Sequence, residues 1–265
     1  MDTLTVYVDG IGFWAPGIAD WAAAEHVLRA DVAPKIDASA KPDATALPPN
    51  ERRRAPEPVL IASEAAGQAC AMADRDPATL PCVFSSTRGD LAITDAMCTT
   101  LAADPRELSP TRFHNSVHNA PAGYWTVATH CHATATAISA GDSSFAAALL
   151  EAAIQVHADG GPVLLAAYDI AARGPLVDVA PSTLPFAMAF VLSATRSSTS
   201  RACLQLRHTA EAAGVADVPA QFAALAGNPM AAQTLPMLIV IARQQTTQVV
   251  IGSGRATSLH IEVAP

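Results

Sequence analysis

Short apolar runs alternate with longer alanine-rich segments through the first 195 residues of the chain. The short runs carry β-branched and aromatic residues and end at glycine, proline or aspartate, which predicts strands. The longer segments have helical length, and several begin beside aspartate or proline, which predicts helices. Because the strand runs are continuously apolar rather than alternating, the pattern indicates an α/β fold. Its sheet is expected to be rich in parallel pairs and covered by helices on both faces.

The pattern assigns an element to most of this region. The predicted strands are residues 4–8, 82–86, 135–139, 163–168 and 186–193. The predicted helices are residues 18–30, 56–74, 91–103, 122–129 and 143–158, and the predicted loops include 12–17 and 109–119. Beyond residue 195 the pattern weakens; there we predict strands at 204–208, 237–241, 248–251 and 259–263 and a helix over 210–226. We therefore expect a domain at residues 1–195 and a short C-terminal extension at residues 196–265.

Composition and charge exclude several classes of protein. Hydrophobic residues make up 51% of the chain and charged residues 15%, which is typical of a chain with a packed core rather than a disordered one. The net charge is −8 and no stripe of Lys and Arg is present, which argues against nucleic-acid binding. The one basic run, Arg52 to Arg54, is typical of a solvated surface. Docking of an acidic partner, such as a carrier protein, is the functional alternative for this run.

Cysteine usage and the ends of the chain bear on where the protein works. The five cysteines are scattered without a CxxC pair, which argues against a zinc ribbon or a disulfide scaffold. The N-terminus lacks the basic region of a signal peptide, and no run reaches the roughly 20 apolar residues of a membrane span. We expect a cytoplasmic protein with no membrane span, no cofactor and no bound metal.

Several short motifs follow one another in a fixed order. They are Val-Tyr-Val-Asp-Gly-Ile-Gly at 6–12, Val-Phe-Ser-Ser-Thr-Arg-Gly at 83–89, a segment at 113–123 ending in Asn-x-x-Ala-Gly, and the apolar strands at 163–169 and 185–193. In this order they resemble the N-terminal half of β-ketoacyl synthases, over roughly residues 1 to 195. The resemblance implies a thiolase-like fold, here with a truncated second half.

The segment 134–151 reads as a strand, a small-residue turn and a helix, and it resembles the place where active synthases carry a nucleophilic cysteine. Counting forward from Gly123 puts that position at Asp142, and counting back from Gly160 puts it at Ser143; neither is a cysteine. The condensing reaction needs a thiolate that accepts an acyl chain as a thioester. The family also uses two histidines from its second half, and only His208 and His260 follow residue 193 here. The resemblance therefore implies that this chain has no catalytic residue of its own.

Because it lacks the cysteine, the chain resembles the chain-length factors, which are the cysteine-less partners of ketosynthases. It resembles in particular those of aryl polyene pigment pathways. This implies pairing with an active β-ketoacyl synthase in a heterodimer or larger assembly, with an acyl carrier protein as a further partner. The chain would help to shape the tunnel for a growing chain in fatty acid or polyketide-type biosynthesis, with strand 135–139 at the interface. The candidate pocket and interface residues are Phe113, His114, Ser116, His118, Asn119, Ala135, Thr136, Ile138, Gly141, Asp142, Ser143 and Phe145.

Other interpretations of these residues stay open. Ser143 could serve a stand-alone acyltransferase or decarboxylase, or the chain could be a purely structural stabiliser of a ketosynthase. His114 and His118 have a metal-compatible spacing, but their segment predicts a loop without a third ligand, so hydrogen bonding is the favoured role. Gly141 to Ser143 matches one hydrolase motif, but the Asp-x-x-His that this class needs is absent, because Thr257 precedes His260 at that spacing. Asp142 is expected to cap the following helix.

Overall fold

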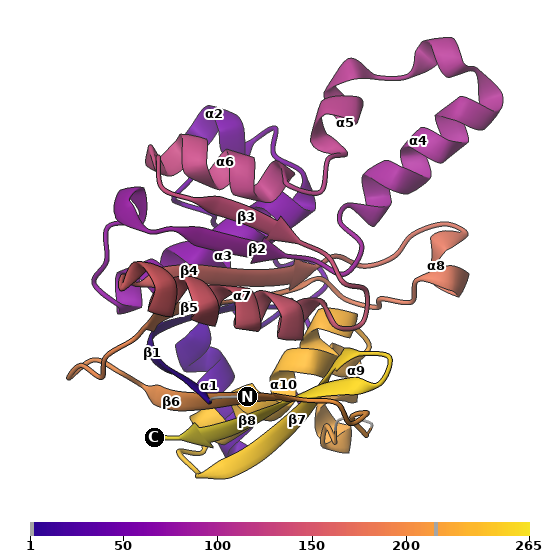
Figure 1. The fold of residues 1–265 in the computed structure, drawn as a ribbon. Helices are drawn as coiled ribbons and strands as arrows, with labels where there is room; N and C mark the ends of the chain where they lie inside the picture. Colours follow the sequence, from indigo (N-terminus) through magenta and orange to yellow (C-terminus); the bar gives the residue numbers. More distant parts are fainter. Residues whose placement is uncertain (1–2, 215–216) are drawn as a thin grey trace.

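One eight-stranded sheet, in the order β3-β2-β4-β5-β1-β6-β8-β7, organises the chain (Figure 1). The structure, a computed structural model, describes residues 3–214 and 217–265. Its strands are β1 (Leu4–Trp14), β2 (Cys82–Ser85), β3 (Ala135–Ile138), β4 (Val163–Asp169), β5 (Phe186–Ser193), β6 (Ala202–Thr209), β7 (Thr247–Gly254) and β8 (Thr257–Ala264). The segment after residue 195 adds β6, β8 and β7 to the side of β1 away from β5, so it continues the same sheet.

The α/β class is confirmed, but the expectation of a parallel-rich sheet is wrong. Strand β2 runs parallel to β3 and β4, and all other described pairs are antiparallel. A continuous apolar run reports that both faces of a strand are covered, and it carries no information about direction. Strands β4 and β5 show this, because every residue of both is buried although they run antiparallel to each other.

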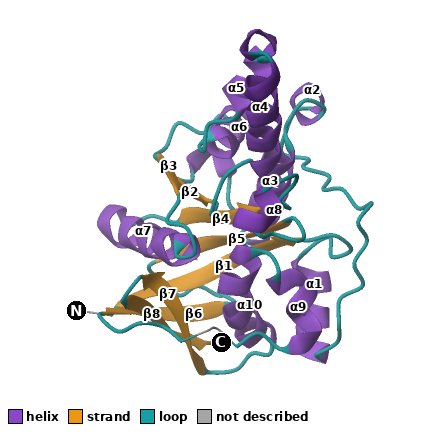
Figure 2. Ribbon diagram, turned by 90° about the vertical axis from the view of Figure 1, so that its right-hand side faces the viewer, coloured by secondary structure: helices purple, strands orange, loops and turns teal. Residues whose placement is uncertain are grey.

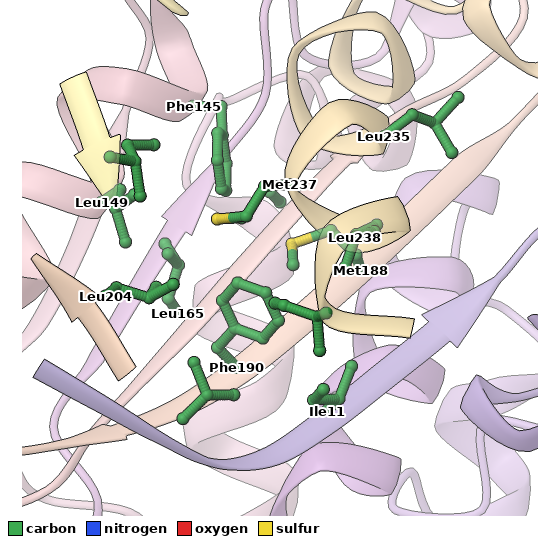
Figure 3. Close-up of a cluster of buried hydrophobic side chains, with 14 of the residues drawn as sticks. Ile11, Phe145, Leu149, Leu165, Met188, Phe190, Leu204, Leu235, Met237 and Leu238 are labelled. Atoms are coloured by element: carbon green, nitrogen blue, oxygen red, sulfur yellow. The ribbon is translucent and has the colours of Figure 1, made fainter. Parts of the chain in front are cut away.

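Helices cover the central strands on both faces. They are α1 (Trp21–Ala30), α2 (Pro49–Arg52), α3 (Glu57–Met72), α4 (Leu91–Ala103), α5 (Pro110–Asn115), α6 (Ala120–Thr129), α7 (Ser144–Asp159), α8 (Leu176–Val179), α9 (Ala223–Ala226) and α10 (Pro229–Ala242). Helix α3 packs over β1, β4 and β5 on one face, while α1, α7 and α10 share the core on the other. Figure 3 shows this second core, where Phe145 and Leu149 of α7 and Met237 and Leu238 of α10 lie around Phe190 of β5.

The predicted loop at residues 12–17 is wrong at its start, because β1 continues through Gly10 and Gly12 to Trp14. These glycines let α3 lie directly against the backbone of β1. A Cβ atom at Gly12 would be 1.8 Å from the carbonyl oxygen of Ala65, and one at Gly10 would be 2.1 Å from that of Ala69. A glycine inside a strand marks this kind of close approach as readily as it marks a turn.

Three further predictions are corrected. The loop predicted at 109–119 contains α5, and the strand predicted at 237–241 lies inside α10, which carries Pro236 in its interior. Helix α10 is apolar almost all round because it is buried on nearly every side, so it lacks the amphipathic period by which a surface helix is found. The helix predicted over 210–226 survives only as α9 and a preceding single turn; residues 215–216 of that prediction lie outside the described residues. Within the described residues, no helix combines the length and the apolar composition that a membrane span requires.

Candidate functional site

The turn between β3 and α7 is organised by Ser144. Its Oγ donates to the carbonyl oxygen of Gly141 at 2.6 Å and accepts from the backbone N–H of Ala140 at 2.9 Å. Gly141 has φ = +55°, in the left-handed region that glycine adopts without strain. Ser144 is completely buried, so its hydroxyl acts as an internal clamp on the turn. The sequence analysis singled out Asp142 and Ser143, one or two residues earlier, and did not predict this role of Ser144.

The expected capping role of Asp142 is wrong. Helix α7 begins at Ser144, one residue later than predicted, so Ser143 holds the N-cap position and makes no capping hydrogen bond with its side chain. Asp142 precedes the cap and is exposed, and Ser143 is half-buried. The turn thus presents a carboxylate and a hydroxyl to the surface, but neither group closes the end of the helix.

The cysteines of the chain all lie away from this turn. Cys82 and Cys131 lie at the opposite end of the parallel pair β2–β3, where the Sγ of Cys131 contacts the carbonyl oxygen of Leu80 at 3.3 Å. Burial raises the pKa of Cys70 and of Cys82 to about 12, which keeps both thiols protonated and unreactive. Cys98 is exposed on α4 and Cys203 belongs to β6. A thioester-forming thiolate is therefore missing from the turn.

His208 and His260 lie at the end of the sheet opposite to the turn. Strand register shows this, because β1 pairs Leu4 with Leu206 at one end and Trp14 with Ala187 at the other, and Ala187 lies beside the carboxyl end of β4. His208 follows Leu206 along β6, and His260 pairs with the residue between them. Neither histidine can act as a base for Ser143 or polarise a substrate held at the turn.

A buried carboxylate lies at the carboxyl end of β4, and sequence reasoning missed it. Asp169 is 4% exposed and accepts hydrogen bonds from Ser86 Oγ at 2.7 Å and from the backbone N–H of Thr87 at 2.9 Å; the Thr87 hydroxyl also donates to it. Asn228, the N-cap of α10, donates to its carbonyl oxygen at 3.1 Å. The available signal was an aspartate directly after one buried strand and a Ser-Ser-Thr run at the end of its parallel neighbour.

Burial raises the pKa of Asp169 to about 7, although the hydrogen bonds from Ser86 and Thr87 and the nearby charge of Arg88 oppose the shift. The folded protein therefore favours the protonated carboxyl, and the contribution of Asp169 to stability is lost as pH rises from about 4 towards about 7. We expect wild type to lose about 1.4 kcal/mol of unfolding free energy per pH unit, relative to Asp169→Asn, within this window. Denaturant unfolding of both proteins across this pH range measures the difference. Parallel pH profiles for the two proteins would contradict the prediction.

The candidate residues from 113 to 119 lie at the end of α5 and in the segment that joins α5 to α6. Phe113 is 60% exposed and His114 and Asn119 are also exposed. Ser116 is half-buried and its Oγ donates to the carbonyl oxygen of Phe113 at 2.8 Å. The Nε2 of His118 lies 3.1 Å from the carbonyl oxygen of Ser86. Across the part of the chain that the structure describes, no group of three His, Cys, Asp or Glu side chains is placed to hold a metal ion.

Phe145 does not belong to this surface. Its side chain is completely buried in the core between α7, α10 and the sheet (Figure 3), and its backbone N–H donates to Gln233 Oε1 at 3.1 Å. Gln233 belongs to α10, so this bond joins the start of α7 to α10. Phe145 thus supports the turn from inside and is not available to a partner.

Strand β3 forms one edge of the sheet and, among the described residues, pairs only with β2. The carbonyl oxygens of Thr134 and Ile138 accept from the backbone of β2, so by the alternation of a strand the N–H and C=O groups of Ala135 and Ala137 point to the open edge. Ala135 is exposed, and Thr136 and Ile138 are half-buried. An unpaired edge of this kind is a ready template for pairing with another chain.

The two helices that lie beside β3 carry exposed apolar residues. Val127 of α6 is 73% exposed and Ile154 of α7 is 52% exposed. Figure 1 shows β3 at the edge of the sheet with α6 on one side and α7 on the other. An open edge between exposed apolar helices is typical of a surface that another protein covers.

Comparison with known proteins places this architecture in a family. The chain matches a chain of the complex of a ketosynthase with its chain length factor from Xenorhabdus doucetiae with a TM-score of 0.74, at 23% identity over 98% of this chain and 99% of that one. It matches the ishigamide ketosynthase/chain length factor with a TM-score of 0.70, at 13% identity over 98% of this chain and 100% of that one. A type II PKS acyl-carrier protein in complex with its ketosynthase gives a TM-score of 0.71, at 12% identity over 98% and 99%.

These structural likenesses show that the fold is shared. No curated protein matches the sequence. A family model described as the N-terminal domain of β-ketoacyl synthases matches residues 20–255, which is most of the chain. The chain therefore belongs to the β-ketoacyl synthase N-terminal domain family, and its fold is thiolase-like.

Proposed function

We propose that this chain is a non-catalytic, chain-length-factor-like subunit that pairs in the cytoplasm with an active β-ketoacyl synthase. It helps to shape the tunnel that holds the growing chain, in aryl polyene or related fatty acid or polyketide-type biosynthesis. The observation that carries the proposal is the turn at Gly141–Ser144, which keeps the strand-turn-helix form of an acylation site without a thiol. Residues 1–195 are the ketosynthase-like domain, and residues 196–265 stand in for the second half.

Two further observations support a partner. The open edge of β3 offers unpaired backbone groups, and the neighbouring helices α6 and α7 carry the exposed apolar residues Val127 and Ile154. The likeness to the chains in the Xenorhabdus and ishigamide structures extends over almost all of this chain and of each of those chains. Both structures are described as a ketosynthase with a chain length factor. The acyl carrier protein is the further partner that we propose, with exposed Arg53 and Arg54 as its candidate contact.

An enzymatic role for Ser143 finds no support in the site. Its hydroxyl would need a neighbouring base to become a nucleophile. His208 and His260 lie at the far end of the sheet, and His118 contacts the carbonyl oxygen of Ser86. None of these three histidines therefore supplies the base that the arrangement of nucleophile, base and orienting group would need at Ser143, which supports the non-catalytic role that we propose.

The Ser116→Trp substitution separates a tunnel-shaping subunit from a purely structural stabiliser. Ser116 is half-buried and lies in the sequence between Phe113, which is exposed, and His118, which is half-buried. An indole ring at this position would narrow the tunnel that we propose. We expect the purified complex to form shorter products, measured by chromatography and mass spectrometry. The matched control is Ser198→Trp, the same change at an exposed serine in the loop before β6. Unchanged product length from a stable Ser116→Trp complex would favour the structural role.

A further inference from the structure

Helices α4 and α5 and the single turn between them, Pro105–Glu107, form an arm (residues 91–115) that projects from the body (Figures 1 and 2). Only Leu91 is buried in α4 and only Asn115 in α5, and these two residues lie at the two roots of the arm. Leu101 is 47% exposed and Phe113 60% exposed along its length. Because the arm has so little packing of its own, its direction depends on how its roots are fixed.

Ser86 joins both roots of the arm to the sheet. Its Oγ accepts from the backbone N–H of Gly89 at 2.9 Å, in the segment that leads into α4. Its carbonyl oxygen contacts the Nε2 of His118 at 3.1 Å, in the segment that leaves α5. The same hydroxyl donates to Asp169 at 2.7 Å, inside the body. One buried serine therefore holds the entry and the exit of the arm and connects both to the end of β4.

The neighbouring bonds extend this network to the open edge of the sheet. The backbone N–H of Ser86 donates to the carbonyl oxygen of Ile138 at 3.3 Å, and Ser139 Oγ donates to the carbonyl oxygen of Thr87 at 2.9 Å. Both contacts lie at the end of β3, next to the turn that precedes α7. Helix α6, which follows His118, packs beside β3. The arm and the end of β3 are thus both hydrogen-bonded to Ser86 and Thr87, the two residues that follow β2.

We propose that Ser86, anchored by Asp169 and joined to His118, is the positioning residue that fixes the direction of the arm, so that the apolar side chains of the arm meet the synthase subunit beside the edge of β3. The identity of that subunit rests on the proposed function. The fixing of the arm does not, because it follows from hydrogen bonds within this chain: those of Ser86 at both roots, and one from the Tyr124 hydroxyl to Asn115 Oδ1 at 3.2 Å at the exit. The Ser86 hydroxyl and carbonyl make three of these bonds, and loss of the hydroxyl removes two of them together.

The arm itself supplies a label site. Cys98 is exposed on α4, and a second spin label can be attached to His26→Cys, which is exposed on α1, in a Cys203→Ser background. Pulsed electron–electron double resonance on the full chain then measures the distance between the label on the arm and the label on the body. We expect one narrow distribution in the parent protein and a broad or split one in Ser86→Ala. Ser86→Thr, which keeps a hydroxyl, should restore the narrow distribution.

The matched control is Asp9→Asn. Asp9 is also a buried carboxylate held by serine hydroxyls, with Ser200 Oγ at 2.7 Å, but it lies at the opposite end of β5. This variant should leave the arm distance unchanged. A Ser86→Ala distribution that matches the parent would overturn the proposal, as would equal broadening in Asp9→Asn.

Partner binding distinguishes failure of this inference from failure of the proposed function. With the synthase subunit present, we expect the Ser86→Ala complex to dissociate at least about tenfold faster than the parent complex, since the arm must be ordered on binding. If the parent chain binds no synthase, the proposed function fails and the spin-label result still decides the positioning role. If the parent binds and Ser86→Ala dissociates at the same rate, the positioning role fails and the proposed function stands.

Discussion

Replacing Ala137 with proline is expected to abolish pairing with a synthase subunit while the isolated chain stays folded. The N–H of Ala137 points to the open edge of β3, so proline removes a donor that a partner would use and leaves the bonds to β2 intact. The pyrrolidine ring also blocks the approach of another strand. Size-exclusion chromatography of the mixed subunits measures the pairing, and thermal unfolding of the chain alone measures its integrity.

The control for this variant lies at the other edge of the sheet. Thr247 is the first residue of β7, which pairs only with β8, and a proline is tolerated at the start of an edge strand. Thr247→Pro should pair with the synthase as wild type does. Equal binding by Ala137→Pro and wild type would show that the partner does not use the edge of β3.

Gly12→Val is expected to cost about 3 kcal/mol of unfolding free energy or more. A Cβ atom at Gly12 would overlap the carbonyl oxygen of Ala65 at 1.8 Å, and neither the strand nor the buried helix α3 can move without opening the core. Denaturant unfolding gives the change. Gly252→Val is the matched control, a strand glycine whose added Cβ meets no atom within 4 Å. Similar losses from both substitutions would refute the role of Gly12 in the close contact between helix and strand.

The elements that the sequence predicted well are those whose burial leaves a local signature. The helix at 91–103 and the strand at 186–193 have the predicted bounds, because one is bounded by an aspartate cap and the other is an uninterrupted apolar run. Strand directions could not be predicted, since they depend on which segments meet. Helix α10 was missed because complete burial makes nearly all its faces apolar, so that residues 237–241 looked like a short buried strand.

The site was predicted in outline, and its supporting contacts were not. The strand-turn-helix followed from local pattern, and the missing thiol followed from the resemblance to ketosynthases together with residue counting. Ser144 and Ser86 could not be found in this way, because their roles depend on hydrogen bonds that form only in the folded chain, including one from Ser86 to Asp169, which is 83 positions away. Phe145 was a candidate for a pocket or an interface, and the first turn of α7 directs its side chain into the core.

The buried network lies at the same strand ends as the turn that precedes α7. Asp169 and Ser86 fix the ends of β2 and β4, and the Thr87 carbonyl holds Ser139 at the end of β3. The turn at Gly141–Ser144 is held by the hydrogen bonds of Ser144 and lies next to these strand ends. In our account, the surface at this turn serves a partner, and the chemistry takes place in that partner.

Intact-mass spectrometry of a co-expressed complex tests this account most directly. The chain is produced with a candidate ketosynthase, isolated by size-exclusion chromatography and incubated with an acylated carrier protein. The account predicts that both chains elute together and that the acyl adduct appears on the ketosynthase alone. An adduct on this chain that disappears in Ser143→Ala, or elution of this chain as a stable monomer without a partner, would contradict it.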